Sequence, residues 1–391
     1  MEFKIKKYVA QSLLEKAALA LAAESGKPIL KNFYFRMIPP DTILVIATDL
    51  ALSVVAKTTL VEMTEGMFPK IVFPGDRLLE IVRAAEDDMM TFTITGAQGD
   101  GKGPGIPTNV EIACARAKWS LKLMDPKEYP DIPDADKLEY VSIDRKIFLE
   151  GVQRTKVAAP IGTYRPALSM VNMANGKMQA ADGVRLHQML VPFEGKKIQI
   201  PFQATEDLVK FLKQTEDEKV YITQTDNHIV FKFGVDVFIA TKATAEFPDV
   251  DKVFIAPTIS DAKAKFTVDR QQLIDGIKRV RLTADVDSKL VVMSLKNNKM
   301  ILMAKDKLGN NAMQDLDIVW EGPDRAIGVD WNFMLLTLQQ IAGQTVEIWL
   351  GSDSKTKRSP LLFRETGFLA ILNQLKLPEE KSKDEVKEVK K

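Results

Sequence analysis

The chain has 391 residues, of which 46% are hydrophobic, so its length and composition predict two or three packed domains. Its 54 lysines and arginines nearly balance 53 aspartates and glutamates, which argues against a disordered chain and against a strongly basic protein that coats DNA. The single cysteine excludes a disulfide framework and a thiolate zinc site and favours a reducing, cytoplasmic environment, and two histidines leave little for metal or acid–base chemistry.

Five predicted elements recur three times in the same order along the chain. They are an amphipathic helix, a strand, a strand that ends in Ala-x-Asp, a short strand that leads into a second helix, and a closing set of alternating strands. The copies of the first helix and of the strand that follows it lie at 14–17 and 27–30, at 149–152 and 165–168, and at 274–277 and 289–292. One such landmark could recur by chance, but five in a fixed order predict three homologous domains.

An aspartate ends the third element in every copy, at Asp49, Asp182 and Asp306. The copies are therefore 133 and 124 residues apart, a typical domain length. Carboxylates can bind metals, but a position shared by all three repeats favours a structural role, in which the side chain caps a turn. We predict turn-capping aspartates here and no metal site.

A glycine-rich stretch at 96–105 nearly fits the motif of a phosphate-binding loop. Gly103, however, replaces the hydroxyl residue that would bind magnesium, and Pro104 opposes the helix whose amino end should hold the phosphates. We predict a hairpin loop between strands at 90–95 and 110–115 instead.

Residues that would support catalysis are scarce. His187 and His228 lie outside any zinc-binding spacing, and Cys114 lies in an alternating strand pattern that is typical of packing. The sequence contains neither Gly-x-Ser-x-Gly nor His-Glu-x-x-His. No apolar run is long enough to span a membrane, and residues 1–6 do not resemble a signal peptide. We therefore expect no enzymatic activity, no cofactor and no membrane partner.

The three repeats resemble the beta subunit of bacterial DNA polymerase III, the DNA sliding clamp. The resemblance extends over residues 1–377, and its clearest segments are 27–32, 47–50, 165–168, 180–186 and 246–249. It implies an α+β fold of three repeated clamp domains, each with two helices packed on antiparallel sheets, so that one chain forms half of a ring. The implied domains are 1–135, 136–257 and 258–377, followed by a disordered charged tail at 378–391.

The resemblance also implies the function of a processivity factor. Two chains would pair head to tail as a homodimer around double-stranded DNA, without sequence preference, and would tether the replicative DNA polymerase after loading by a clamp loader. A monomeric DNA-binding replication accessory protein with the same fold is the main alternative. A nucleic-acid enzyme would need a non-repeated cluster of acids or bases, and a scaffold without a DNA role would leave the cations on the predicted helices unexplained.

Cations on or just after the predicted helices are the candidate phosphate contacts, since these helices would line the hole of the ring. The candidates are Lys16, Lys27, Arg77, Arg83, Arg154, Lys156, Arg165, Lys210, Lys213, Lys278, Arg279 and Arg281. Any one of them can equally be an ordinary solvated side chain. Glu15, Glu80 and Glu86 dilute the positive charge, so we expect weak, salt-sensitive binding.

Family members also dock partner peptides in an apolar groove, and matching motifs place that groove here. Its predicted residues are Leu168, Gly183, Val184, Arg185, Leu186, Pro248, Lys252 and Val253, with a wall formed by Asn373, Gln374, Leu375, Lys376 and Leu377. Leu168 and Leu186 can equally be core residues. Asn373 and Gln374 replace apolar anchors of the family. These departures lead to the hypothesis of a divergent, phage-encoded clamp with its own partner motif.

Overall fold

The computed structural model describes residues 1–24, 26–64, 70–86, 88–98, 106–160, 165–352 and 359–377. The chain forms two compact units. The first comprises Met1–Val152, Met173–Gly176 and Pro192–Thr244, and the second comprises Gln153–Asn172, Lys177–Val191 and Ala245–Lys391.

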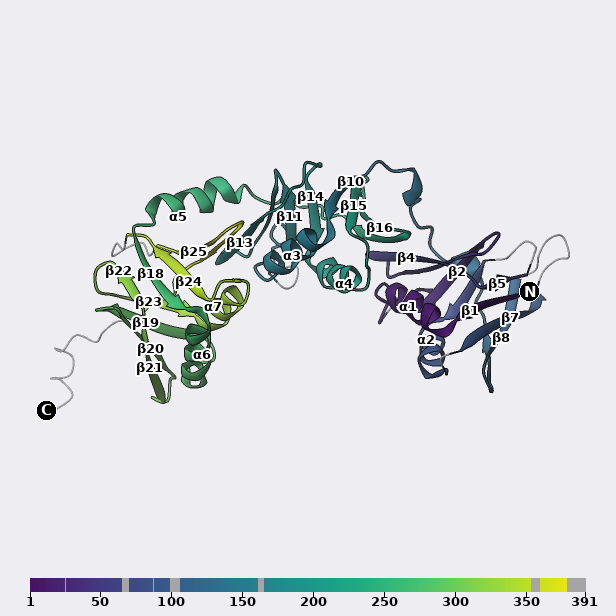
Figure 1. Ribbon diagram of the computed structural model, residues 1–391, viewed down its shortest axis with the longest axis horizontal. Helices are drawn as coiled ribbons and strands as arrows, with labels where there is room; N and C mark the ends of the chain where they lie inside the picture. Colours follow the sequence, from purple (N-terminus) through teal and green to yellow (C-terminus); the bar gives the residue numbers. More distant parts are fainter. Residues whose placement is uncertain are drawn as a thin grey trace. The chain divides into compact units, whose positions relative to one another are not determined.

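An eight-stranded antiparallel sheet organises the first unit (Figure 1). Its order is β10 (Val141–Asp144), β15 (Lys219–Gln224), β16 (His228–Phe233), β17 (Asp236–Thr241), β4 (Leu52–Thr59), β3 (Thr42–Thr48), β2 (Asn32–Ile38) and β6 (Ile71–Pro74). In the middle of the sheet, β17 pairs with β4 although they are far apart in sequence, with Ile239 opposite Ser53. This pairing joins strands of the first repeat to strands of the second in one hydrogen-bonded layer.

A second sheet of the first unit has five strands. Its order is β5 (Glu62–Met63), β1 (Glu2–Lys6), β7 (Met89–Gln98), β8 (Ile106–Cys114) and β9 (Ala117–Lys122). The antiparallel pairing of β7 with β8 confirms the predicted hairpin, whose loop lies outside the described residues. Cys114 is buried in β8 and donates its thiol hydrogen to a backbone carbonyl, as expected of a packing residue.

Short amphipathic helices cover these sheets. In the first unit they are α1 (Lys7–Ala18), α2 (Gly75–Ala84) and α4 (Phe202–Lys213), which follows β14 (Ile198–Pro201); α3 (Arg145–Lys156) crosses the boundary between the units. The predicted stripe on α1 is buried at Leu13, Leu14 and Ala17, and the helix packs against β3, β4 and α2. Short 3₁₀ turns at Pro28–Lys31, Pro126–Glu128 and Ala135–Lys137 connect the other elements.

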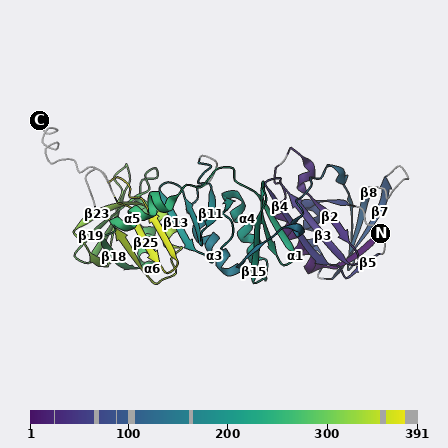
Figure 2. The same cartoon turned by 90° about the horizontal axis from the view of Figure 1, so that it is seen from above.

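The second unit also contains two antiparallel sheets. Within this unit, the strands of the larger sheet run in the order β11 (Met170–Ala174), β12 (Lys177–Ala181), β13 (Arg185–Leu190), β26 (Phe368–Leu372), β25 (Leu361–Glu365), β24 (Thr345–Leu350), β18 (Ala264–Asp269) and β22 (Val319–Glu321). The smaller is β21 (Asn311–Asp317), β20 (Lys299–Lys305), β19 (Leu290–Lys296) and β23 (Arg325–Asp330). The helices are a π-helical turn at Asp251–Ile255, α5 (Ala256–Asp261), α6 (Arg270–Val280), the 3₁₀ turn Arg281–Thr283, and α7 (Trp331–Leu338). Two views place α5 beside β25 (Figures 1 and 2).

The order of elements occurs three times along the chain, as a strand, a helix, a group of strands, a second helix and a closing group of strands. The predicted α+β fold with helices on antiparallel sheets is confirmed. The predicted strand at 27–30 is wrong, because Pro28–Lys31 form a 3₁₀ turn whose carbonyl at Pro28 accepts from the Asn32 side chain at 2.7 Å. The predicted strand at 165–168 is also wrong, since the Leu168 and Ser169 amides both fold back onto the Arg165 carbonyl.

The three repeated aspartates cap turns, as predicted. The Asp49 carboxylate accepts from the amides of Ala51 (2.9 Å) and Leu52 (2.6 Å). Asp182 accepts from Val184 and Arg185, and Asp306 from Leu308 and Asn310. A short acceptor two residues before the donor closes the turn locally, so the same sequence signal produces the same structure three times.

Candidate functional site

The junction of β13 and β26 places the chain's last described residues beside the Asp182 turn. Because Arg185 is opposite Leu372, the chain beyond β26 continues along the residues that precede β13. The Asn373 amide donates to the Val184 carbonyl at 2.8 Å, and its side chain reaches the Gly183 carbonyl at 3.4 Å. Farther on, the Leu375 amide donates to the Gly328 carbonyl at 2.8 Å. The structure therefore brings together the two predicted walls of the groove, residues 183–186 and 373–377.

The Arg185 side chain supports the Asp182 turn. Its side chain is buried, donates from Nε to the Asp182 carboxylate at 2.9 Å, and stacks its guanidinium 4.1 Å from the centre of the Phe333 ring. Burial lowers the pKa of Arg185, and the adjacent Asp182 charge acts in the opposite direction. Arg185 therefore supports the groove from inside the protein, because its buried guanidinium contacts Asp182 and Phe333.

Gly183 allows the Arg165 side chain to approach the backbone of this turn closely. Its φ is +90°, a conformation that favours glycine, and a Cβ atom there would lie 2.3 Å from Nη1 of Arg165. Arg165 is exposed and donates to the Asp182 carbonyl at 2.8 Å. One predicted phosphate contact, Arg165, therefore lies beside the predicted groove.

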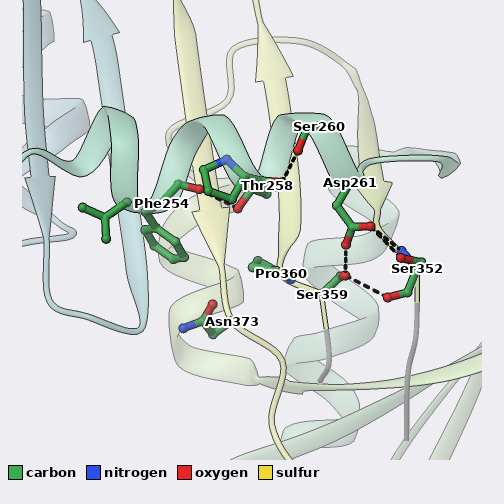
Figure 3. Close-up of a pocket in the computed structure, with 10 residues that line it drawn as sticks. Phe254, Thr258, Ser260, Asp261, Ser352, Ser359, Pro360 and Asn373 are labelled. Carbon is green, nitrogen blue, oxygen red and sulfur yellow. Dashed lines mark hydrogen bonds between the residues drawn. The ribbon is translucent and has the colours of Figure 1, made fainter. Parts of the chain in front are cut away.

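The segment from the π-helical turn through α5 is held at both ends on the larger sheet of the second unit. At its start, Asp251 accepts from Lys177 Nζ at 2.7 Å and from Gln179 Nε2 at 2.8 Å. At its end, Asp261 accepts from the Ser352 hydroxyl at 2.6 Å and from the Ser359 hydroxyl (Figure 3). Hydrogen bonds from these two serines hold the pKa of the Asp261 carboxyl below its usual range.

A cavity of about 530 Å³ lies alongside this segment. Val253, Phe254, Pro257 and Thr258 line one side, and Asn373 is among the residues opposite them (Figure 3). Val253 is 70% exposed, which is unusual for a valine and leaves an apolar surface available at the rim. Two predicted groove residues, Val253 and Asn373, thus line one hollow.

The other predicted groove residues differ in how deeply they are buried. Leu186 is fully buried, so it is a core residue and the prediction of peptide contact is wrong for it. Leu168 is half-buried, while Pro248 and Lys252 are exposed beside Asp249, whose side chain accepts from the Lys252 amide at 3.2 Å. Several residues that line the cavity were not predicted from the sequence, namely Phe254, Pro257, Thr258, Ser260, Asp261, Ser352, Ser359 and Pro360. No local motif marks them, because they meet only through contacts about a hundred residues apart in the chain.

The predicted phosphate contacts differ in their ion pairs and in their exposure to solvent. In the first unit, Lys16 is ion-paired with Asp236 at 2.7 Å, Arg83 with Glu15 at 3.2 Å, and Lys210 with Asp207 at 2.8 Å. Arg83 and Lys210 are nevertheless exposed, as are Lys27, Arg77, Arg165, Lys213, Lys278 and Arg279. Lys156 is half-buried on α3, and Arg281 is half-buried with its guanidinium 4.7 Å from the Trp331 ring.

Arg154 is wrong as a phosphate contact. Its side chain is buried, forms an ion pair with Glu365, and lies 4.0 Å from the centre of the Phe368 ring. A guanidinium enclosed by a carboxylate and an aromatic face cannot reach a phosphate without leaving both. Helical spacing alone could not show this, because Glu365 and Phe368 come from the other end of the chain.

His187 lies next to Arg154 and is fully buried. Its Nδ1 is 2.8 Å from the Arg154 carbonyl, and its Nε2 is 3.1 Å from the Thr337 hydroxyl. Burial lowers the pKa of the ring to about 4. His187 therefore connects β13 to α3 and α7 as a neutral hydrogen-bonding group.

Among the described residues, no helix is both long enough and apolar enough to cross a lipid bilayer. The same part of the chain contains no group of three His, Cys, Asp or Glu side chains that could hold a metal ion.

Comparison with known proteins gives matches at both ends of the chain and over its length. A family model described as the N-terminal domain of the DNA polymerase III beta subunit matches residues 1–133, and one for its C-terminal domain matches 257–366. The chain is 22% identical over 364 residues to the beta sliding clamp of Vibrio cholerae and over 369 residues to that of Staphylococcus aureus. Each alignment covers 89% of this chain and 92% of the relative.

Solved structures with the same fold include the DNA polymerase III beta subunits of Pseudomonas aeruginosa and Thermotoga maritima. Their TM-scores are 0.84 and 0.83, with 18% and 21% sequence identity. Both matches cover 96% of this chain and 100% of the other.

Replacing His187 with glutamine should flatten the dependence of stability on pH. The folded ring has a pKa near 4, whereas the ring in the unfolded chain titrates near 6.5, so unfolding takes up a proton between these values. The contribution of His187 is fully present above pH 6.5, and roughly 3 kcal/mol of it is lost as the pH falls to 4. Urea unfolding at about pH 7 and about pH 4.5 measures the difference. An unchanged pH slope in His187→Gln would contradict this account, and His228→Gln, at the other histidine, serves as the control.

Proposed function

The chain belongs to the DNA polymerase III beta subunits, the family of DNA sliding clamps, and from this premise we propose how its residues contact DNA, a second copy and a partner peptide. A sliding clamp is a processivity factor and not an enzyme. The observation that carries the function is the threefold recurrence of one order of strands and helices over the matched residues. We propose that its partners are duplex DNA, the replicative polymerase and a clamp loader, and that the protein acts in the cytoplasm.

We propose that the three repeats are the domains 1–135, 136–257 and 258–377. A ring built from them would hold DNA by enclosing it, so that no single contact needs to be strong. Weak, sequence-independent contacts to phosphate then let the ring slide, which is why exposed cations with acidic neighbours suit this role. The proposed phosphate contacts are the predicted cations without Arg154, and two of them, Lys278 and Arg279, are exposed next to each other on α6.

Reversing the charge of Lys278 and Arg279 together should weaken binding to duplex DNA of any sequence. Each phosphate contact contributes about 0.9 to the slope of log affinity against log salt, so losing two should reduce that slope by up to about 2. Fluorescence anisotropy with labelled duplexes of two unrelated sequences, at several salt concentrations, measures both quantities. Lys296→Glu with Lys305→Glu, exposed cations on β19 and β20, is the matched control. Equal slopes in the two double variants would refute the assignment.

We further propose that the cavity beside Val253 receives the peptide of a partner. Val253 supplies an exposed apolar contact at its rim. Asn373 presents an amide where the family has an apolar anchor, so the peptide of this protein's own partner should offer a hydrogen-bonding group at that place. This difference in chemistry should weaken binding of the fully apolar motif used by bacterial polymerases.

Two substitutions should move affinity for a bacterial polymerase clamp-binding peptide in opposite directions. Val253→Asp places a charge on the apolar rim and should weaken binding by roughly tenfold or more. Asn373→Met restores an apolar wall and should strengthen it several-fold, on the order of 1 kcal/mol. Isothermal titration calorimetry measures both, with Val319→Asp, an exposed valine on β22, as the control. If the wild-type chain binds this peptide as tightly as bacterial clamps do, the proposal of an altered specificity is wrong.

Self-association is proposed to use two open sheet edges. In the first unit, β9 ends its sheet and exposes Lys118 and Lys122. In the second unit, β21 ends its sheet and exposes Asp315 and Asp317, with Met313 at 70% exposure. Head-to-tail pairing of β9 from one copy with β21 from another would complete both edges and match opposite charges.

Met313→Lys should therefore convert a dimer into a monomer. It adds a cation to an edge that is proposed to face the lysines of β9, and it removes apolar contact. Light scattering after size exclusion, near micromolar concentration, should give twice 43.7 kDa for the wild type and the single mass for the variant. Val235→Asp, in an exposed turn, should leave the dimer intact. A wild-type monomer that still binds DNA would instead support a monomeric accessory protein.

A further inference from the structure

The opening strand of the second repeat differs from those of the first and third repeats at its outer edge. In the first repeat, β1 pairs with β7 on one side and with the short strand β5 on the other. In the third repeat, β18 pairs likewise with β24 and with the short strand β22. In the second repeat, β10 pairs with β15 alone and ends the order of its sheet. Among the described residues, β10 is thus the opening strand whose outer edge has no pairing strand.

The segment of the second repeat that corresponds to β5 and β22 is 191–197, between β13 and β14. Pro192 has no amide hydrogen to donate to a neighbouring strand. Farther along, the Phe193 ring turns into the core, and a Cβ atom on Gly195 would lie 2.3 Å from it. The segment therefore bends around its own phenylalanine and cannot lie straight against β10.

A cavity of about 430 Å³ occupies the space that this leaves, wholly within the first unit. Leu138, Tyr140 and Val141 line it together with Phe193, Ile198 and Ile222. Val141 is 39% exposed although it lies in a strand, so its side chain is available at the opening. The cavity thus combines an apolar lining with an open strand edge.

The polar lining indicates what such a cavity could bind. Lys137 and Lys196 outnumber Glu139, the acid among the lining residues, although Lys137 also pairs with Asp134 at 3.2 Å. Gln224 also lines the cavity, and its Oε1 is buried without a hydrogen-bond donor in the described part of the chain. A buried acceptor without a donor costs stability that a bound N–H group could restore after a small rotation of the side chain.

We propose that β10 and this cavity form a second docking site, which takes an extended acidic segment of a partner protein as an added strand. The backbone of that segment pairs with the open edge of β10, and an apolar side chain enters the cavity. Acidic residues on either side of it meet Lys137 and Lys196. This site is separate in residues and chemistry from the cavity beside Val253.

A labelled peptide of sequence Asp-Glu-Val-Phe-Val-Asp-Glu tests the site on the full chain. Fluorescence anisotropy should show saturable binding, with a dissociation constant on the order of micromolar to a hundred micromolar. The peptide Lys-Lys-Val-Phe-Val-Lys-Lys should bind at least tenfold more weakly, because its charges are reversed. Bound acidic peptide should also slow hydrogen exchange of the amides at 141–144, which a purely electrostatic surface contact would not do.

Two variants at this site and two control variants test whether the peptide binds there. Val141→Asp should weaken binding roughly tenfold, and Lys196→Glu about threefold, since an exposed charge contributes less than a buried apolar contact. Lys305→Glu makes the same charge change elsewhere, and it should leave affinity within about twofold, as should Val253→Asp at the other cavity. Absence of acidic-peptide binding, equal binding of the basic peptide, unchanged exchange at 141–144, or wild-type affinity in Val141→Asp would each overturn the proposal.

Discussion

Hydrogen bonding across the repeats is the constraint on which the rest of the structure depends. A strand at the end of a sheet leaves a row of amides and carbonyls without partners, and three small repeats in one chain produce many such ends. In the first unit, β17 pairs with β4 and provides hydrogen-bond partners for its backbone groups. In the second unit, β13 does the same for β26. These pairings unite strands from successive repeats, so each repeat is stabilised by its neighbour as well as by its own core. The edges that remain open within each unit are those at which we propose that other molecules add.

The pairing of β13 with β26 also explains why charge is buried near it. Arg154, Glu365 and His187 surround this junction and hold α3, β13 and α7 together through specific hydrogen bonds. Glu365 accepts in addition from the amides of Ala342 and Gly343, both at 3.0 Å. An enclosed ion pair contributes little net stability compared with apolar packing, but breaking it leaves an unpaired charge. The cluster therefore favours one arrangement of these elements over alternatives.

In the proposed groove beside this junction, the backbone and the side chains depend on different parts of the sequence. Its backbone depends on Asp182, Gly183 and the pairing of β13, which are features of the turn and the sheet. Its chemistry depends on side chains such as Asn373 and Val253, which can change without disturbing that backbone. Divergence at about a fifth sequence identity to the known clamps is compatible with an unchanged fold for this reason.

Local signals in the sequence determined the repeats, the amphipathic stripe of α1, the hairpin of β7 and β8, and the turns at Asp49, Asp182 and Asp306. Each depends on residues within a few positions of one another, so a short pattern is sufficient to predict it. The segment at 27–30 was predicted wrongly because its apolar residues suit a strand, while Pro28 and the Asn32 side chain favour a tight turn. Tertiary structure alone decided that Arg154 is buried against Glu365, that Leu186 belongs to the core, and that Val253 and Asn373 line one cavity. These outcomes depend on which distant segments meet when the sheets pair, and no pattern of neighbouring residues contains that information.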